Sequence, residues 1–350
     1  MNAPLRDILL KLCRREDLTR DEAESAFLHL LSGEATDSQI GGLLIGLAAK
    51  GTTVDELVGA VKVMRRKSVT VPVSGSAYMS PSESSEIILD TCGTGGDVRG
   101  TFNVSTAAAI IAAAAGVRVV KHGNRSATSK SGSADVLEKL GVNLDLKPDQ
   151  LIQCLAKCNL CFAFARNHNP AMKHVALARA SLGIPTIFNV MGPLTNPAGA
   201  KHQLLGVFAP ELTDKLAAVL RELGSERAWV VHAEDGLDEI STMGPTRITE
   251  LHHGQLHTWT LSPTDLGLPY SRLSDLTVNS VEEAADRMHE ILNDRNAPCR
   301  DIAALNAAAA MVIAGRTESI AEGLQLAMEA ISSGRARRTL EQLVLASQNV

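Results

Sequence analysis

Short apolar segments alternate with amphipathic helical patterns from residue 87 onward, and this alternation constrains the fold more than any other feature of the chain. The segments typical of strands read "IILD", "VRVVKHG", "LCFAFA", "HQLLGVF" and "RAWVVHA". Parallel strands need long crossover connections, which are usually helices. The pattern therefore predicts an α/β domain with a mostly parallel central sheet flanked by helices. Hydrophobic residues make up 45% of the chain but aromatic ones only 3%, so the core is expected to consist of Ala, Leu, Ile and Val.

The N-terminal part of the chain has a different pattern, without strand signals. It contains four helical patterns, at about 3–15, 20–32, 37–50 and 54–67. Thr19, Thr36 and Thr53 precede three of them and are predicted to be N-caps. A Ser- and Pro-rich linker follows at 71–86. We therefore expect a small all-helical domain at residues 1–72 and a larger α/β domain at residues 73–350.

Charge and composition also limit the partners and the location. The net charge of -5 provides no general attraction for a nucleic-acid backbone. No apolar run approaches the roughly 20 residues that a membrane-spanning helix needs. Six cysteines form no disulfide framework in a chain of this length. We expect a cytoplasmic protein that binds neither nucleic acid nor membrane.

A glycine-rich loop follows the first predicted strand, with the sequence Gly93-Thr94-Gly95-Gly96-Asp97. Such loops bind phosphate when backbone N–H groups and a helix N-terminus point at the anion. The dinucleotide fingerprint is absent because Val98 stands where its third glycine belongs, and no P-loop lysine follows. Taken alone, the loop is equally compatible with a tight turn that binds nothing.

Two further polar segments make phosphate binding the better interpretation. "NVST" at 103–106 begins the next helix, and "KHGNRSATSKSGSAD" at 121–135 follows the second strand. The second segment carries the cations Lys121, Arg125 and Lys130 and several hydroxyl groups. Ligands of open α/β sheets bind outside the carboxyl ends of the strands, so both segments are expected to face one crevice.

Adjacent carboxylates follow the fifth predicted strand, in the sequence "AEDGLDEIS". Asp238 and Glu239 could be an acidic surface turn. Mg²⁺, however, is typically held by one or two carboxylates together with substrate phosphates and water. Opposite a phosphate crevice, these residues are predicted to bind Mg²⁺.

Four segments, in this order, resemble the anthranilate phosphoribosyltransferase family of tryptophan biosynthesis: "DTCGTGGDVRGTFNVST", "KHGNRSATSKSGSADVLEKLG", "GPLTNPA" and "DGLDEIS". The resemblance extends from about residue 5 to 345. It implies transfer of the phosphoribosyl group of 5-phosphoribosyl 1-pyrophosphate (PRPP), with Mg²⁺, to the amine of anthranilate. The products would be N-(5-phosphoribosyl)anthranilate and pyrophosphate. It also implies a homodimer formed through the helical domain, to which a helix at about 170–198 would be joined.

The resemblance further implies a set of site residues. The pyrophosphate and ribose would contact Gly93, Gly96, Asp97, Thr101, Asn103, Val104, Ser105 and Thr106. The phosphates would be enclosed by Lys121, His122, Gly123, Asn124, Arg125, Ser126, Ala127, Thr128, Ser129 and Ser133. Anthranilate would contact Gly93, Asn124 and Arg179, and Mg²⁺ would be bound near Ser105, Asp238 and Glu239. Lys121 and Arg179 would act by electrostatics and positioning, with no general base.

The segment "FARNHNPAMKH" departs from the family pattern. Asn169 stands at the usual His, Arg166 at the usual Pro, and His168 is one residue early. Asn169 can donate a hydrogen bond but cannot titrate. This leaves open a phosphoribosyltransferase with another aromatic amine acceptor, and an enzyme like the pyrimidine nucleoside phosphorylases, which share the fold. A non-catalytic binding protein fits poorly, because the metal carboxylates are present.

Overall fold

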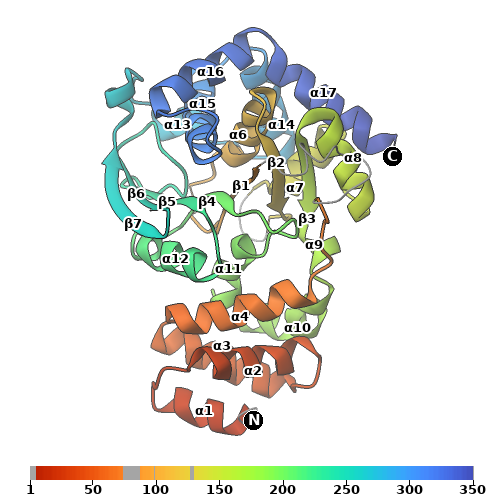
Figure 1. The fold of residues 1–350 in the computed structure, drawn as a ribbon, viewed down its shortest axis with the longest axis vertical. Coiled ribbons are helices and arrows are strands. Elements are labelled where there is room, and N and C mark those ends of the chain that lie inside the picture. Colours follow the sequence, from red (N-terminus) through yellow and green to blue (C-terminus); the bar gives the residue numbers. More distant parts are fainter. Residues whose placement is uncertain (1–4, 74–86, 98, 127–129, 350) are drawn as a thin grey trace.

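The computed structural model describes residues 5–73, 87–97, 99–126 and 130–349. A helical bundle lies at one end of the molecule and a sheet with its covering helices at the other (Figure 1). Two hydrophobic cores hold these parts together. One lies between the sheet and the C-terminal helices, and the other continues from the bundle to the opposite face of the sheet.

The four expected N-terminal helices are all present: α1 (Leu5–Cys13), α2 (Arg20–Leu31), α3 (Asp37–Lys50) and α4 (Val54–Lys67). Thr19, Thr36 and Thr53 each form a capping box with the residue three positions later, which confirms the predicted N-caps. The sequence therefore determined where these helices begin.

A later segment returns to the bundle. Helix α10 (Lys173–Leu182) packs on α2 and α3 (Figure 1). The expected single helix at 170–198 is wrong, because α10 ends at Gly183, whose φ is 61°. The other elements of the segment are short: η1 (Pro170–Met172), α11 (Ile187–Met191) and η2 (Gly192–Leu194). A left-handed glycine followed by Pro185 is a strong signal that ends a helix.

The central sheet has seven strands in the order β3-β2-β1-β4-β5-β6-β7. Five are parallel: β1 (Ile88–Gly93), β2 (Arg118–Gly123), β3 (Leu160–Phe164), β4 (His202–Gly206) and β5 (Arg227–Ala233). An antiparallel hairpin, β6 (Thr246–His252) and β7 (Gln255–Leu261), completes the sheet. The predicted fold class is confirmed, although β1 extends three residues beyond the expected "IILD".

The strand order sets the position of the crevice. From β1 the chain moves to β2 and β3 on one side, and it later returns to β4 and β5 on the other. The connections therefore diverge at the carboxyl ends of β1 and β4, where open α/β sheets bind ligands.

Small residues let the helices approach one another closely above the sheet. In α6 (Val104–Ala114), residues 107–113 are at most 3% exposed, and five of the seven are Ala. Helix α6 packs against the Ala-rich α15 (Ala297–Ile313) and against α17 (Arg335–Gln348). The remaining elements are α7 (Ser133–Lys139), α8 (Pro148–Cys158), α9 (Ala165–His168), α12 (Glu211–Glu222), η3 (Pro263–Leu266), α13 (Leu273–Leu276), α14 (Val281–Leu292) and α16 (Ile320–Ser332). In the part of the chain that the structure describes, no helix combines the length and the apolar character needed to cross a membrane.

Candidate functional site

Two glycines end the neighbouring strands β1 and β4, and they pair with each other as Gly93 and Gly206. A Cβ atom on Gly206 would lie 1.6 Å from the backbone oxygen of Asp238. A Cβ atom on Gly93 would lie 2.8 Å from Oδ2 of the same residue. Both positions therefore let the loop after β5 run close beneath the crevice. Sequence reasoning selected Gly93 but missed Gly206, whose only signal is a glycine at the end of "HQLLG".

The glycine loop folds back onto this carboxylate. Gly95 and Gly96 have φ values of 63° and 89°, which favour glycine. The backbone N–H of Gly95 donates to Asp238 Oδ2 at 3.0 Å, and that of Thr94 donates to the oxygen of Gly206 at 2.9 Å. One N–H of the glycine loop is thus hydrogen-bonded to the Asp238 carboxyl group, while another holds the end of β4.

Lys121, Ser105 and Glu239 meet at the start of α6, although they come from three separate elements. The Nζ atom of Lys121 donates to the backbone oxygen of Thr91 and to Ser105 Oγ at 3.1 Å. The backbone N–H of Ser105 donates to Glu239 Oε1 at 3.0 Å. Burial lowers the pKa of Lys121, while nearby Asp90 acts in the opposite direction. The structure therefore brings together a cation, a hydroxyl and a carboxylate.

Asp90 lies beneath this cluster, and sequence reasoning missed it. The side chain is fully buried and accepts the backbone N–H of His122 at 3.0 Å. Burial raises its pKa, and Asn196 and Lys121 act against that shift. Asp90 thus supplies a buried counter-charge for Lys121 and fixes the end of β2.

Three acidic side chains, Asp97, Asp238 and Glu239, lie close enough after β1 and β5 to shift one another's pKa values. Burial, followed by the charge of Asp97, raises the pKa of Asp238 to about 7. Burial and the charge of Asp238 raise the pKa of Glu239 to about 8. Burial also raises the pKa of Asp97, against its hydrogen bond from the Arg99 backbone. A divalent cation would relieve this repulsion, so the donor set fits Mg²⁺.

The same residues leave room for ligands from a substrate. Among the residues that the structure describes, no three His, Cys, Asp or Glu side chains converge closely enough to hold a metal by themselves. Mg²⁺ at Asp238 and Glu239 would therefore need further oxygens, from Ser105, water or phosphate.

The loop after β2 is attached to the start of α6. Asn103 Nδ2 donates to the Ser131 backbone oxygen at 3.2 Å, and Ser131 Oγ donates to Asn103 Oδ1 at 3.1 Å. Ser133 Oγ donates to the Asn124 backbone oxygen at 3.4 Å. Arg125 is directed to α7 instead, where it pairs with Asp135 and Glu138. Ala127, Thr128 and Ser129 lie outside the described residues.

Other expected contacts occupy less direct positions. The side chains of Val104 and Thr106 are 1% exposed and lie in the core behind the loop. The hydroxyl of Thr106 has no hydrogen-bond partner there. Thr101 forms an isolated antiparallel bridge with Thr277. Val104 and Thr106 therefore present no exposed side chain to a ligand at the strand ends.

Arg179 lies on α10, the helix that returns to the bundle. Its guanidinium carbon is 4.9 Å from the centre of the Phe188 ring, and Phe188 in turn meets Phe27 edge-on at 5.7 Å. Burial lowers the pKa of Arg179. Across the described parts of the chain, burial is the cause of this shift and no carboxylate contributes to it.

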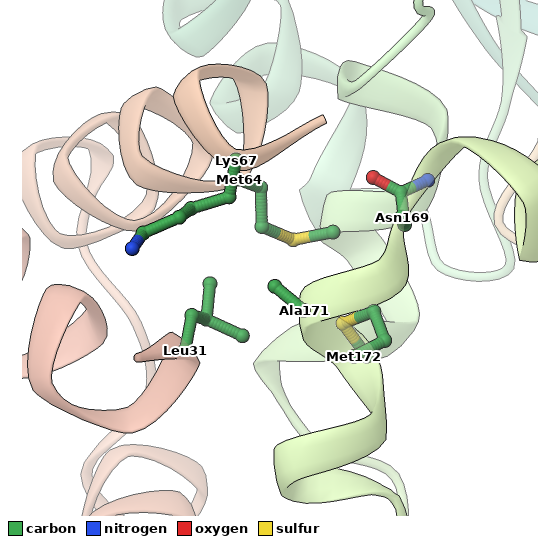
Figure 2. Close-up of a pocket in the computed structure, with 6 residues that line it drawn as sticks. All are labelled: Leu31, Met64, Lys67, Asn169, Ala171 and Met172. Carbon is green, nitrogen blue, oxygen red and sulfur yellow. The ribbon is translucent and has the colours of Figure 1, made fainter. Parts of the chain in front are cut away.

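Asn169 faces the helical bundle. Ser68 Oγ donates to Asn169 Oδ1 at 2.8 Å, and Asn169 Nδ2 donates to the Ala165 oxygen at 3.2 Å. Figure 2 shows Asn169 at a small cavity between the bundle and η1. The residues that line this cavity are Leu31, Met64, Lys67, Asn169, Ala171 and Met172.

His168 is buried next to the crevice strand instead. Its Nδ1 donates to the Val69 oxygen at 2.7 Å, while its Nε2 has no partner. Burial, and then the neighbouring His168, lower the pKa of His122 to about 3. Burial also lowers the pKa of His168, against its hydrogen bond to Val69. The His122 imidazole is neutral at physiological pH, and its pKa of about 3 makes it too weak a base for general-base catalysis near pH 7.

Comparisons with known proteins agree with this geometry. Residues 6–68 match the model described as "Glycosyl transferase family, helical bundle domain", and residues 85–337 match "Glycosyl transferase family, a/b domain". The anthranilate phosphoribosyltransferase of Methylobacterium nodulans is 48% identical over 97% of each chain. That of Rhizobium etli is 46% identical over 99% of each chain.

Solved structures share the fold over the whole chain. The anthranilate phosphoribosyltransferase of Thermus thermophilus has a TM-score of 0.88 and 38% identity, covering 98% of this chain and 99% of that one. The Saccharomyces cerevisiae enzyme in complex with PRPP and Mg has a TM-score of 0.88 and 28% identity, covering 99% and 98%. The same yeast enzyme has also been solved in complex with 4-fluoroanthranilate. The chain therefore belongs to the anthranilate phosphoribosyltransferases, within the glycosyl transferase family.

Proposed function

We propose that this protein transfers the phosphoribosyl group of PRPP to the amine of anthranilate, with Mg²⁺, in tryptophan biosynthesis. The observation that carries the proposal is the convergence of Lys121, Ser105 and Glu239 where the strand connections diverge. In the proposed reaction the C1–oxygen bond of PRPP breaks and a bond from C1 to the anthranilate nitrogen forms. Pyrophosphate leaves, and the nitrogen loses one proton.

The chain's own groups stabilise the departing pyrophosphate. When bound, Mg²⁺ neutralises part of the charge that develops on pyrophosphate. Lys121 adds a buried positive charge beside Ser105, and its hydrogen bond to Ser105 Oγ already holds it in place, so it needs no reorganisation during the reaction. Asp238 and Glu239 orient the metal end of the substrate. The remaining phosphate and ribose contacts are those expected from the sequence at 101–106 and 121–133.

The acceptor is positioned rather than activated. An aniline nitrogen is uncharged near neutral pH, so the attack requires no strong base. Arg179 is proposed to hold the anthranilate carboxylate as a bidentate pair, with Phe188 supporting the guanidinium. Gly93 and Asn124 are proposed to contact the ring. Correct placement of the two reactants alone can lower the barrier by several kcal/mol.

The test is to follow the loss of anthranilate fluorescence with PRPP and Mg²⁺, with and without EDTA. Parallel reactions contain para-aminobenzoate in place of anthranilate, or a pyrimidine nucleoside with inorganic phosphate. We expect magnesium-dependent loss of anthranilate and no turnover in the parallel reactions. Turnover of para-aminobenzoate at a comparable rate would favour another aromatic amine acceptor, and phosphorolysis of the nucleoside would favour the phosphorylase alternative.

We also propose that residues 1–72, with the segment at 170–198, form the small domain that makes a homodimer contact. Large apolar side chains are exposed on three of its adjoining helices: Leu10 (45%) on α1, Ile45 (42%) on α3 and Leu177 (68%) on α10. Light scattering should give twice the chain mass for the wild-type protein. Leu177→Arg is expected to weaken the dimer, whereas Leu345→Arg, at an equally exposed leucine on α17, should leave it intact. A monomeric wild-type protein would contradict the proposal.

A cytosolic location is part of the same proposal. All six cysteines are unpaired, and only Cys13 is exposed. Unpaired thiols are typical of proteins in reducing compartments. Fractionation of cells that produce the protein should recover it with cytosolic markers.

A further inference from the structure

A single carboxylate holds together the two ends of the loop after β2. Asp135 lies in the first turn of α7, and its Oδ2 accepts the backbone N–H of Ser126 at 3.1 Å and that of Gly132 at 3.0 Å. A Cβ atom on Gly132 would lie 2.2 Å from the Ser126 nitrogen, so the backbone at Gly132 is in direct contact with the backbone at Ser126. Asp135 thus holds Ser126, where the chain enters the loop, against Gly132, where it leaves. We call this pair of residues the neck of the loop.

Arg125 completes this arrangement from within the loop. Its Nη1 donates to Asp135 Oδ1 at 2.9 Å and to Glu138 Oε2 at 2.7 Å, while Nη2 donates to Glu138 Oε1 at 2.9 Å. The guanidinium also lies over the Phe164 ring, at 5.7 Å from its centre. Two carboxylates and an aromatic face therefore occupy this cation on the α7 side of the loop.

A second attachment links the same neck to the catalytic cluster. Asn103 and Ser131 exchange two hydrogen bonds, and Asn103 directly precedes α6. Two residues later, Ser105 contacts Lys121 and Glu239. A shift of the neck would therefore be transmitted to the first turn of α6, where the proposed metal and pyrophosphate site lies.

We propose that Asp135 is a positioning residue that holds Ser126 against Gly132 beside the proposed PRPP site, and that Arg125 is its counter-ion rather than a phosphate ligand. The inference rests on the function proposed above, and it reassigns Arg125 from the role that the sequence suggested. Groups that are held in place before substrate binds lose less conformational entropy on binding. Without the Asp135 charge, the Ser126 and Gly132 N–H groups would lose their charge-assisted hydrogen bonds, and the contact between these two residues would weaken.

The two roles of Arg125 predict opposite effects of Asp135→Asn. If Asp135 presets the loop, loss of its charge weakens PRPP binding, by about tenfold for one charge-assisted hydrogen bond. If Arg125 binds phosphate, the substitution removes one of the two carboxylates that compete for the guanidinium, with Glu138 remaining, and PRPP binds at least as tightly as before.

The experiment compares Asp135→Asn, Arg125→Ala and the double variant in the full-length protein with Mg²⁺. Calorimetry gives the dissociation constant of PRPP, and steady-state assays give kcat and both KM values. Glu282→Gln is the matched control, because it breaks the exposed pair between α7 and α14 (Lys139 Nζ to Glu282 Oε1, 3.1 Å) without touching the loop. Hydrogen exchange of peptides that contain Ser126 and Gly132 reports the hydrogen bonds of these two N–H groups independently of activity.

We expect Asp135→Asn to raise the PRPP dissociation constant and KM about tenfold, with the anthranilate KM changed less than about threefold. Hydrogen exchange at Ser126 and Gly132 should be faster in Asp135→Asn. The PRPP dissociation constant of the double variant should be no higher than that of the more affected single variant, because the two residues act together. Glu282→Gln should match the wild type in all of these measurements. Unchanged or tighter PRPP binding in Asp135→Asn would overturn the inference. If the wild type does not convert PRPP and anthranilate, the proposed function fails, while the exchange data still decide whether Asp135 holds Ser126 and Gly132 together.

A milder variant covers the case in which Asp135→Asn does not fold. Arg125→Lys keeps a positive charge near Asp135 but loses the planar fork that a phosphate would require. PRPP affinity within about threefold of wild type supports a counter-ion, and a loss of tenfold or more overturns the assignment.

Discussion

Gly206→Ala tests the central geometric claim, that two strand-end glycines admit the metal-binding loop. The added Cβ atom would lie 1.6 Å from the Asp238 oxygen, whereas real contacts of this kind are essentially never shorter than 3.0 Å. One of the two backbone segments must therefore move by about 1.4 Å, and a misplacement near 1 Å is enough to cost about 100-fold in rate.

The loop has few ways to absorb that movement. Leu237 and Ile240, on either side of Asp238 and Glu239, are fully buried. Asn306 Oδ1 accepts the backbone N–H of Ile240 at 3.0 Å, and Asn306 Nδ2 donates to the backbone oxygen of Ile240 at 2.8 Å. We expect kcat/KM to fall at least about 100-fold, with a loss of folding free energy of about 1–3 kcal/mol, the usual cost of overpacking.

The assay follows anthranilate fluorescence over a magnesium titration, with thermal unfolding measured in parallel. Gly244→Ala is the control, since its Cβ atom would meet Asp235 Oδ2 at an ordinary 3.7 Å. The control should retain wild-type activity and stability. If Gly206→Ala keeps activity within tenfold of wild type and an unchanged magnesium dependence, the proposed packing of the loop is wrong.

Three further predictions concern charge, the acceptor and pH. Lys121→Met removes the buried cation beside Ser105. We expect kcat to fall about 100-fold, which is the usual effect of losing one preorganised donor. Kinetics near those of the wild type would exclude the electrostatic role of Lys121. Arg179→Lys loses the planar guanidinium that can bind a carboxylate through two hydrogen bonds, so the KM for anthranilate should rise about tenfold. Calorimetry should show an unchanged PRPP affinity. A change in PRPP affinity alone would show that Arg179 does not belong to the acceptor site. His122 has a pKa of about 3 in the folded protein, below its unfolded value of 6.5. As the pH falls, the unfolded state therefore binds a proton before the folded state does. Folding stability is consequently lost as the pH falls from about 6.5 towards 3. His122→Asn should therefore lose less stability than wild type between pH 7.5 and 5 in urea unfolding, by up to about 1.4 kcal/mol per pH unit, and parallel curves would contradict a buried neutral imidazole.

Much of the architecture followed from local signals. Threonine caps marked the starts of α2, α3 and α4, and the alternation of strands and helices predicted the parallel sheet. The loops carrying Gly93, Lys121 and Asp238 could be selected because open α/β sheets bind ligands at strand ends. Each of these inferences depends only on neighbouring residues or on a general rule of topology.

Other features depended on contacts between distant segments. Gly206 matters because the Asp238 backbone crosses it, and the buried Asp90 because it lies beneath Lys121. Arg125 looked like a phosphate ligand in a basic loop, but the structure pairs it with Asp135 and Glu138 on the next helix. The order of residues along a loop does not show which way a long side chain turns.

The sequence by itself determined the family, the two types of domain and the loops that hold the chemistry, because capping, periodicity and motif spacing are written in consecutive residues. Only the tertiary structure decided which of two adjacent residues, His168 or Asn169, is buried beside His122 and which faces the bundle at Ser68. That choice depends on how the returning segment packs between the two domains, and packing is a property of surfaces formed by residues about a hundred positions apart.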